Sequence, residues 1–340
     1  MKIMPRLLLG AALAAVASAF AAPANYQVVA HYRIGGDAAG YDYLSVDPGA
    51  RRLYVSHTTR FEVLDADSGK KVGEIGPVVR AHGAAIAAEA GHGFASSGTD
   101  ALITMFDLKT LATIKQIKST GANPDAIEYD PATKRVYAAN HGSGDVTVIE
   151  ATSGDIVGTV KFGEGKLEAL GFDGRGSGFV LAEDKSAVFV FDLQTLQPKA
   201  KWSLAPGEGG TGLAVDPAHH RVFAACANKR VVVLDSDTGK VIATPASGED
   251  PDGLAFDPAT GRIFTTNPDG TLSIIQQESA DKYSPLPTVS TAPGARTVAF
   301  DPKTGRVFTS TAQRGPKPAT GNGRAPILPD TFEVIVVGTK

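Results

Sequence analysis

Acidic side chains recur at one position of a repeated pattern in this chain of 340 residues. Each copy of the pattern has a short apolar segment that ends in an acid, which we call the marker acid. The recurring acidic position lies five residues before this marker. The residues at this position are Asp42, Ala84, Asp125, Glu168, Thr211, Asp252 and Arg296. If the copies surround one axis, four carboxylates and one guanidinium share a narrow mouth, which would concentrate counter-ions. The pattern therefore predicts a binding site for a cation or an amine.

A structural role is the alternative interpretation of these acids. Each carboxylate could cap its own turn or pair with a neighbour, and both Asn123-Pro124-Asp125 and Asp250-Pro251-Asp252 are ordinary turn sequences. The two interpretations differ in one respect, because carboxylates that crowd one mouth should have raised pKa values. The sequence leaves both interpretations open.

Three histidines lie near the same end of the pattern. His57 and His141 stand at, or one residue past, the end of a predicted second strand, and His82 lies in the segment that enters the second copy. If the first three copies are neighbours, these imidazoles could hold Zn²⁺ or Cu²⁺ together with Asp42 or Asp125. No two of them have a local ligand spacing, so we assign no metal ligands and expect no cofactor, with a divalent metal as the open alternative.

The last copy contains a long loop between Thr311 and Thr331 that is rich in proline and glycine. Its cationic residues are Arg314, Lys317 and Arg324. Loops of this length without secondary structure of their own are usually functional or disordered. We therefore expect a basic flap beside the acidic mouth. Charge of both signs on one face would suit a zwitterionic small molecule or a protein partner.

Two independent markers give the period of the repeat. The acid that closes the first apolar segment recurs at Asp47, Glu89, Asp130, Asp173, Asp216, Asp257 and Asp301. A second marker, at the end of the third segment, recurs at Asp65, Asp107, Glu150, Asp192, Asp235 and Gln276. Successive markers are 41 to 44 residues apart, which is the size of a four-stranded propeller blade. The sequence predicts an all-β, seven-bladed β-propeller with four antiparallel strands in each blade.

The two ends of the chain supply the parts of one incomplete blade. Residues 28–35 align with the fourth strand of the third copy but precede the first complete blade. At the other end, residues 332–337 form a third strand with no fourth strand after it. We therefore expect the N-terminal strand to complete blade seven, because this pairing removes an exposed strand edge.

The N-terminus has the features of a secretory signal peptide. Lys2 and Arg6 precede the apolar residues 7–16, and Ala19-Phe20-Ala21 is a small-x-small cleavage sequence. We expect cleavage after residues 1–21, which leaves a single propeller domain over residues 22–340 in the periplasm or outside the cell. We expect this mature chain to be a monomer without a membrane span. Its one cysteine, Cys226, allows no disulfide within the chain.

Several classes of function lack the residues that they require. The sequence contains no Cys-x-x-Cys-His haem motif, no Gly-x-Ser-x-Gly elbow and no Walker loop. Loss of Lys2 and Arg6 leaves 31 basic residues against 36 acidic ones, a net charge near −5. A negative chain is a poor match for nucleic acid, which requires a basic face.

The strand sequences resemble the YVTN-repeat β-propellers, the YncE-like family. Second strands of this type are residues 52–57 (RLYVSH), 135–140 (RVYAAN) and 262–267 (RIFTTN), and third strands are 146–150 (VTVIE) and 231–235 (VVVLD). The resemblance covers about residues 26–337. It implies a secreted or periplasmic seven-bladed propeller, commonly without an assigned reaction, because the repeated residues build blades and define no active site.

We therefore predict a binding or protein-interaction module whose candidate residues are those of the mouth, the three histidines and the flap. A metal-assisted hydrolase of the propeller-lactonase kind is the alternative, in which acids and an imidazole hold a divalent ion that polarises an ester. A scaffold without a small-molecule site is a third interpretation. The sequence favours binding over catalysis and identifies no ligand.

Overall fold

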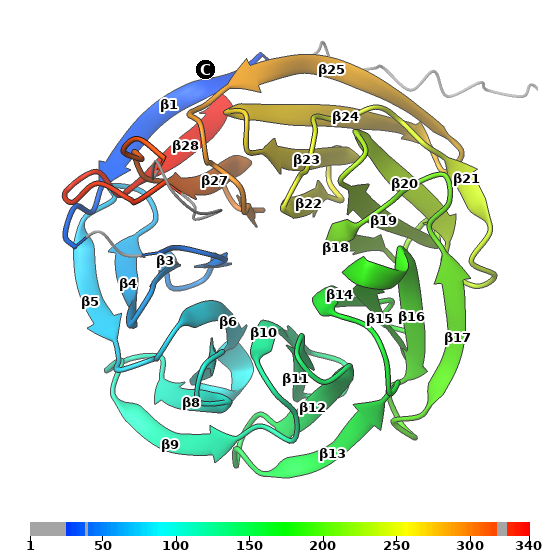
Figure 1. Ribbon diagram of the computed structural model, residues 1–340, viewed down its shortest axis with the longest axis horizontal. Helices are drawn as coiled ribbons and strands as arrows, with labels where there is room; N and C mark the ends of the chain where they lie inside the picture. The colour runs from blue at the N-terminus through cyan, green and yellow to red at the C-terminus, as the bar shows by residue number, and fades with distance from the viewer. Residues whose placement is uncertain (1–24, 38–39, 318–324) are drawn as a thin grey trace, which may run out of the picture.

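The computed structural model describes residues 25–37, 40–317 and 325–340. Its strands form seven four-stranded antiparallel sheets that stand around a central axis (Figure 1). The predicted fold is confirmed. The predicted signal peptide, residues 1–21, lies outside the described residues. In the described part of the chain, no helix is long and apolar enough to cross a membrane.

Each blade runs from an inner strand at the channel to an outer strand at the rim. Blade one contains β2 (Leu44–Asp47), β3 (Arg52–His57), β4 (Arg60–Asp65) and β5 (Lys71–Ile75). Blade two contains β6 (Ala81–Ala87), β7 (His92–Ser97), β8 (Leu102–Asp107) and β9 (Thr113–Lys118). Blade three contains β10 (Pro124–Asp130), β11 (Arg135–Asn140), β12 (Asp145–Glu150) and β13 (Ile156–Lys161). Blade four contains β14 (Leu167–Phe172), β15 (Ser177–Ala182), β16 (Ala187–Asp192) and β17 (Pro198–Ser203).

The other three blades follow the same plan. Blade five contains β18 (Gly210–Asp216), β19 (Arg221–Cys226), β20 (Arg230–Asp235) and β21 (Val241–Ala243). Blade six contains β22 (Gly253–Asp257), β23 (Arg262–Asn267), β24 (Thr271–Ser279) and β25 (Lys282–Ser290). Blade seven contains β26 (Ala299–Asp301), β27 (Arg306–Thr311), β28 (Glu333–Thr339) and, at the rim, β1 (Tyr26–Arg33). Single 3-10 turns follow β6 and β15 (Ala88–Ala90 and Glu183–Lys185).

The third residue of every second strand is aromatic and fully buried. These residues are Tyr54, Phe94, Tyr137, Phe179, Phe223, Phe264 and Phe308. Several of them contact an aromatic ring of the next blade, for example Tyr137 with Phe172, whose ring centroids are 4.8 Å apart. Burial of one such side chain contributes about 1.5–3 kcal/mol. The repeated aromatic position therefore holds neighbouring blades together.

The acids that close the inner strands accept hydrogen bonds from backbone N–H groups of the turn that follows, except Glu89 among the described residues. The carboxylate of Asp130 accepts hydrogen bonds from the backbone N–H groups of Ala132 and Thr133, at 3.3 and 3.0 Å. Asp301 accepts the corresponding bond from the N–H of Lys303 at 3.0 Å. These acids cap turns between the first and second strands.

The ring closes between the two ends of the chain. Strand β1 pairs with β28 from Tyr26 opposite Thr339 to Arg33 opposite Glu333, with one bulge. Figure 1 shows the two strands side by side in blade seven. The hydroxyl of Tyr32 also donates hydrogen bonds to the carbonyls of Ala66 and Asp67 in blade one, at 3.1 and 2.9 Å. Strand β1 therefore completes its own blade and contacts the next one.

We predict that a chain beginning at Ile34 is markedly less stable than a chain beginning at Asn25. The truncation exposes the edge of β28 and removes two buried aromatic side chains, Tyr26 and Tyr32. Those two side chains alone account for about 3–6 kcal/mol of unfolding free energy. Urea denaturation followed by circular dichroism measures the difference. Equal unfolding midpoints for the two chains would show that β1 does not hold the ring closed.

Candidate functional site

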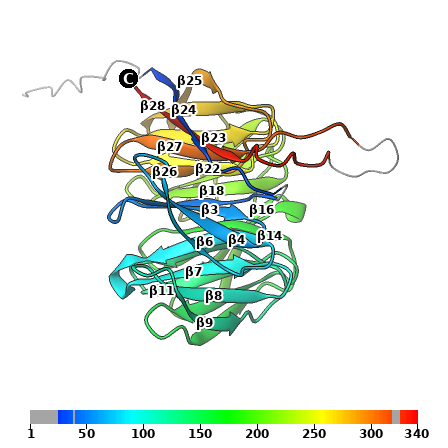
Figure 2. The same cartoon turned by 90° about the vertical axis from the view of Figure 1, so that its left-hand side faces the viewer.

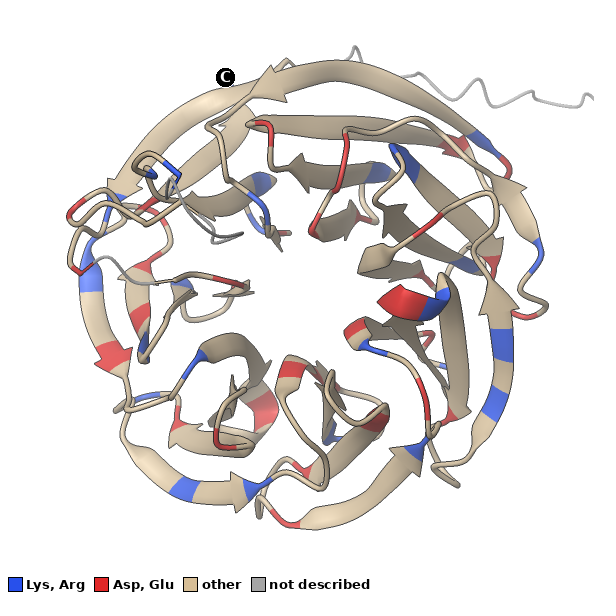
Figure 3. Ribbon diagram, in the orientation of Figure 1, with Lys and Arg blue, Asp and Glu red and all other residues tan. Residues whose placement is uncertain are grey.

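The inner strands begin around a cavity of about 680 Å³ at one end of the channel. Six of the seven predicted ring positions line it, namely Asp42, Asp125, Glu168, Thr211, Asp252 and Arg296. The blade-two residue of the predicted ring, Ala84, does not. His82 lines the cavity in its place. In blade two, Ala87 and not the marker Glu89 pairs with the first residue of the second strand, as Asp130 does in blade three, so the equivalent ring position is His82. Figure 3 shows acidic segments at the inner ends of several blades.

The four ring carboxylates do not cap turns. Within the described residues, the side-chain partner of Asp42 and Asp125 is His82, that of Asp252 is Arg296, and Glu168 contacts His141 and Tyr43. None of these carboxylates accepts a backbone N–H, in contrast to the marker acids. Of the two interpretations left open by the sequence, capping is therefore excluded for these acids, whereas pairing with a neighbour applies to each of them.

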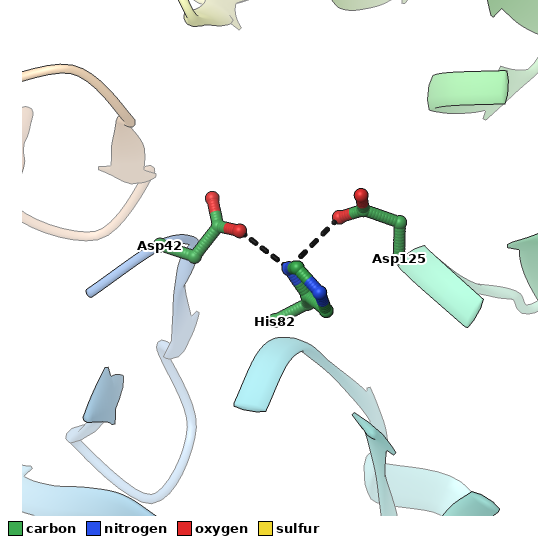
Figure 4. A group of neighbouring side chains, drawn as sticks. All are labelled: Asp42, His82 and Asp125. Carbon is green, nitrogen blue, oxygen red and sulfur yellow. Dashed lines mark hydrogen bonds and ion pairs between the residues drawn. The ribbon is translucent and has the colours of Figure 1, made fainter. Parts of the chain in front are cut away.

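His82 joins blades one, two and three. Its Nδ1 atom lies 2.6 Å from Oδ2 of Asp42 and 3.2 Å from Oδ1 of Asp125 (Figure 4). His82 and Asp125 are only 5% and 8% exposed. Burial would lower the pKa of His82, but the hydrogen bond to Asp42 and the negative charge of Asp125 outweigh it, so this pKa is raised. Two carboxylates thus converge on one imidazole nitrogen.

A second imidazole lies on the other side of Asp125. Nδ1 of His141 is 2.9 Å from Oε1 of Glu168, and contact with this carboxylate raises the pKa of His141. Ligand atoms of Asp125, His141 and Glu168 lie within 4.8 Å of one another, as do those of Asp42, His82 and Asp125. Asp125 is common to both groups. Each group has the donor types that bind zinc in proteins.

Crowding and burial raise the pKa of ring carboxyls, as the sequence predicts. Burial raises the pKa of Asp125 to about 7; the positive charge of His82 opposes this, and the negative charges of Asp42 and Glu168 add to it. Burial also raises the pKa of Asp252 to about 6, although Arg296 lowers it in part. Asp125 and Asp252 therefore hold their protons more tightly than free carboxyls do.

On the opposite side of the cavity, the charges of Asp252 and Arg296 neutralise each other. Nε of Arg296 donates a short hydrogen bond to Oδ2 of Asp252. The acids around Arg296 keep its guanidinium charged, so its pKa is raised despite burial. Negative charge that lacks a permanent cation is consequently concentrated at Asp42, Asp125 and Glu168, over blades one, three and four.

Tyr43, like Asp252, lines both this cavity and a smaller one of about 80 Å³ in the channel. Its hydroxyl lies 3.4 Å from Oε2 of Glu168. Burial and the nearby carboxylates, Glu168 first, raise its pKa well above the usual value. Glu128 lines the smaller cavity, at the position opposite the buried aromatic residue, where the other six blades have Ser, Ala or Gly. Enclosure in the channel raises the pKa of Glu128 to about 7.

The flap contributes cations to the same cavity. Arg314 and Lys317 line it, and the Arg314 guanidinium donates to the carbonyl of Ala325 at 2.8 Å. Arg324, the third predicted flap cation, lies outside the described residues. Figure 2 shows the chain on either side of 318–324 leaving the ring at one face. Arg80, which no sequence pattern indicates, also lines the cavity.

His57 does not belong to the mouth, so its predicted place there is wrong. Its side chain is fully buried, with Nδ1 3.3 Å from Oε1 of Glu62 and its ring 4.7 Å from that of Phe332 in blade seven. His57 ends β3, whereas His141 stands one residue past the end of β11. Neighbouring residues of an extended chain point to opposite sides, so only His141 faces the cavity.

Comparisons with known proteins support the fold alone. No family model matches the chain, and no curated protein matches it by sequence. A solved structure of Kuenenia stuttgartiensis hydrazine synthase is similar, with a TM-score of 0.70 and 16% sequence identity over 81% of this chain and 94% of that one. The chain is therefore a seven-bladed propeller, and membership of the YncE-like family stays a prediction.

The Glu62 cluster predicts a pH-dependent difference in stability. Burial would raise the pKa of Glu62, but contacts from His57, Lys71 and Arg60 lower it to about 2. A carboxyl with a lowered folded pKa stabilises the fold above its unfolded pKa of about 4.3, and the effect is lost as pH falls toward 2. We expect Glu62→Gln to cost about 1.5–3 kcal/mol at pH 7, because it weakens charged hydrogen bonds.

Chemical denaturation at pH 7, 4 and 3 measures this difference, which should shrink at each step. Glu74→Gln is the matched control, because Glu74 pairs with the same lysine but is exposed. Its cost should stay below about 1 kcal/mol. A Glu62→Gln cost that did not change with pH would show that the Glu62 charge is not stabilising.

Proposed function

We propose that this propeller is a binding module for a small zwitterionic molecule, held in the mouth of its channel. The main support is the division of charge across the cavity, with Asp42, Asp125 and Glu168 on one side and Arg314 and Lys317 at the flap. An amine would contact the carboxylates, and an acid group would contact the flap. The volume of about 680 Å³ is within the range of small-molecule pockets.

A concave site favours a small molecule over a protein partner. The charged groups lie inside the cavity, and His82 and Asp125 are almost fully buried, so a flat protein surface would not contact them. The fold is consistent with either kind of binding. The N-terminal sequence supports export, and we propose that the ligand is met in the periplasm or outside the cell.

Matched pairs of ligands test the proposal. We expect lysine to raise the unfolding temperature of the EDTA-treated protein and to bind in calorimetry, since a ligand that binds only the folded state stabilises it. Cadaverine has the same amine without the carboxylate. Arg314→Gln/Lys317→Gln should weaken the binding of lysine about tenfold, a loss of about 1.4 kcal/mol, and leave the affinity for cadaverine unchanged. Glu168→Gln should weaken the binding of both compounds.

Asp155→Asn is the control for loss of negative charge, because Asp155 is exposed and pairs with Lys115 at the rim. It should not change either affinity. Arginine and agmatine form a second pair of the same design. The proposal fails if none of the four compounds binds, or if Asp155→Asn weakens binding as much as Glu168→Gln.

A metal-assisted hydrolase is the second candidate function, and the two imidazole–carboxylate groups around Asp125 favour it. A divalent ion at this place would polarise a lactone carbonyl. We expect lactone hydrolysis with added Zn²⁺, monitored by pH-stat, to be lost in His82→Gln. Absence of turnover by a protein shown to contain zinc would exclude this alternative for the lactones tested.

A further inference from the structure

We propose that the acidic side of the cavity is a centre for a divalent transition-metal ion, with Asp42, His82 and Asp125 as its ligands. This inference deepens the proposed binding function of the same cavity and rests on it. The ligand atoms of these residues lie within 4.8 Å of one another, and they come from three different blades.

The hydrogen bonding around His82 leaves one carboxylate without a proper donor. A single Nδ1–H group can be shared only poorly between two acceptors, and the distances of 2.6 and 3.2 Å favour Asp42. Within the described residues, the Asp125 carboxylate accepts no hydrogen bond with suitable geometry and has His82 as its one ion-pair partner. A buried carboxylate normally has several donors. A cation between the three groups would supply what Asp125 lacks.

The opposite nitrogen of His82 supplies an independent observation. Nε2 of His82 and Oδ1 of Asn123 are both buried and lack a hydrogen-bond partner among the described residues. Both atoms lie beside Gly98, where an added Cβ would be 2.5 and 2.4 Å from them. Histidines that bind a metal usually donate their other N–H to a nearby oxygen. The tautomer protonated at Nε2 would place its proton near Asn123 and free Nδ1 to bind the ion.

The backbones that carry the ligands are held in place. The hydroxyl of Ser96 accepts from the N–H of Gly83, next to His82, at 2.9 Å and donates to the carbonyl of Asp125 at 2.6 Å. The Asp42 N–H donates to the hydroxyl of Ser56 at 2.7 Å, and its carbonyl accepts from Thr297 at 2.6 Å. Because these backbones are already fixed, little conformational entropy is lost when the side chains gather around an ion, as a metal site requires.

The donor set selects the class of ion. One imidazole and two carboxylates suit Zn²⁺ and its first-row neighbours. Calcium prefers six to eight oxygen ligands, and magnesium keeps several waters. His141 and Glu168 adjoin Asp125 on its other side, so they can complete the coordination or hold a second ion. We therefore expect zinc to bind much more tightly than calcium or magnesium.

Metal titration of the EDTA-treated full chain tests the inference. We expect at least one Zn²⁺ per chain by calorimetry and by elemental analysis after dialysis. His82→Gln and Asp125→Asn should each weaken the binding of Zn²⁺ by at least about tenfold. This is the lower end of the loss in affinity that follows removal of a residue supporting a metal site. Co²⁺ should give visible absorption bands that change in His82→Gln. Circular dichroism shows whether each variant folds, and Asp42→Asn replaces any that does not.

Asp250→Asn is the matched control, because Asp250 lines the same cavity outside the ligand group. Its backbone has a φ of 51°, which asparagine tolerates. Zinc affinity in this variant should stay within about threefold of the original, a difference below about 1 kcal/mol. Equal losses in Asp250→Asn and His82→Gln, or no zinc binding at all, would overturn the metal centre. If zinc does not bind but lysine does, the metal centre is wrong and the proposed function is unaffected. If neither zinc nor lysine binds, both proposals are wrong.

Discussion

Pairing of β1 with β28 determines the circumference of the ring, and the candidate site depends on it. Each ring residue at the mouth comes from a different inner strand or from the segment that leads into it, so the distances between ring residues follow from the angle between successive blades. That angle is maintained by the buried aromatic residue of each second strand and by the closure of blade seven. In the closed ring, Arg296 of blade seven and Asp42 of blade one line the same cavity. An open ring would separate them.

Gathering these charges works against stability. A buried carboxylate is costly unless donors or a cation accompany it, and the raised pKa values of Asp125 and Asp252 express that cost. The marker acids show how the same fold treats an acid that serves structure, because Asp130 accepts two backbone N–H groups in its turn. A buried carboxylate such as Asp125, which accepts no hydrogen bond among the described residues, is therefore better explained by a ligand than by the needs of the fold.

The repeat made the fold and most of the ring predictable from the sequence, because a constant period places equivalent residues at equivalent points. Local departures from the repeat could not be predicted in this way. In blade two, Ala87 and not the acid Glu89 pairs with the start of the second strand, so the ring position is His82 and not Ala84. A difference of one residue at the end of the second strand sends His57 between blades and His141 into the cavity. Tyr43 could have been found from the repeat, because the equivalent residues, Gly83, Ala126, Ala169, Gly212, Gly253 and Thr297, are all small or short.

The difference between uniform and variable positions suggests how function can be recognised in a repeat protein for which comparison establishes the fold alone. A position that stays uniform through all blades, such as the buried aromatic of the second strand, is explained by packing. Packing does not explain a position at which one blade has a different kind of residue, because the other six blades fold without that residue. Tyr43 and Glu128 are departures of this kind, and both line the channel or its mouth. Since local inconsistency with a fold is expected at functional sites, these residues identify the channel mouth more specifically than the shared fold does.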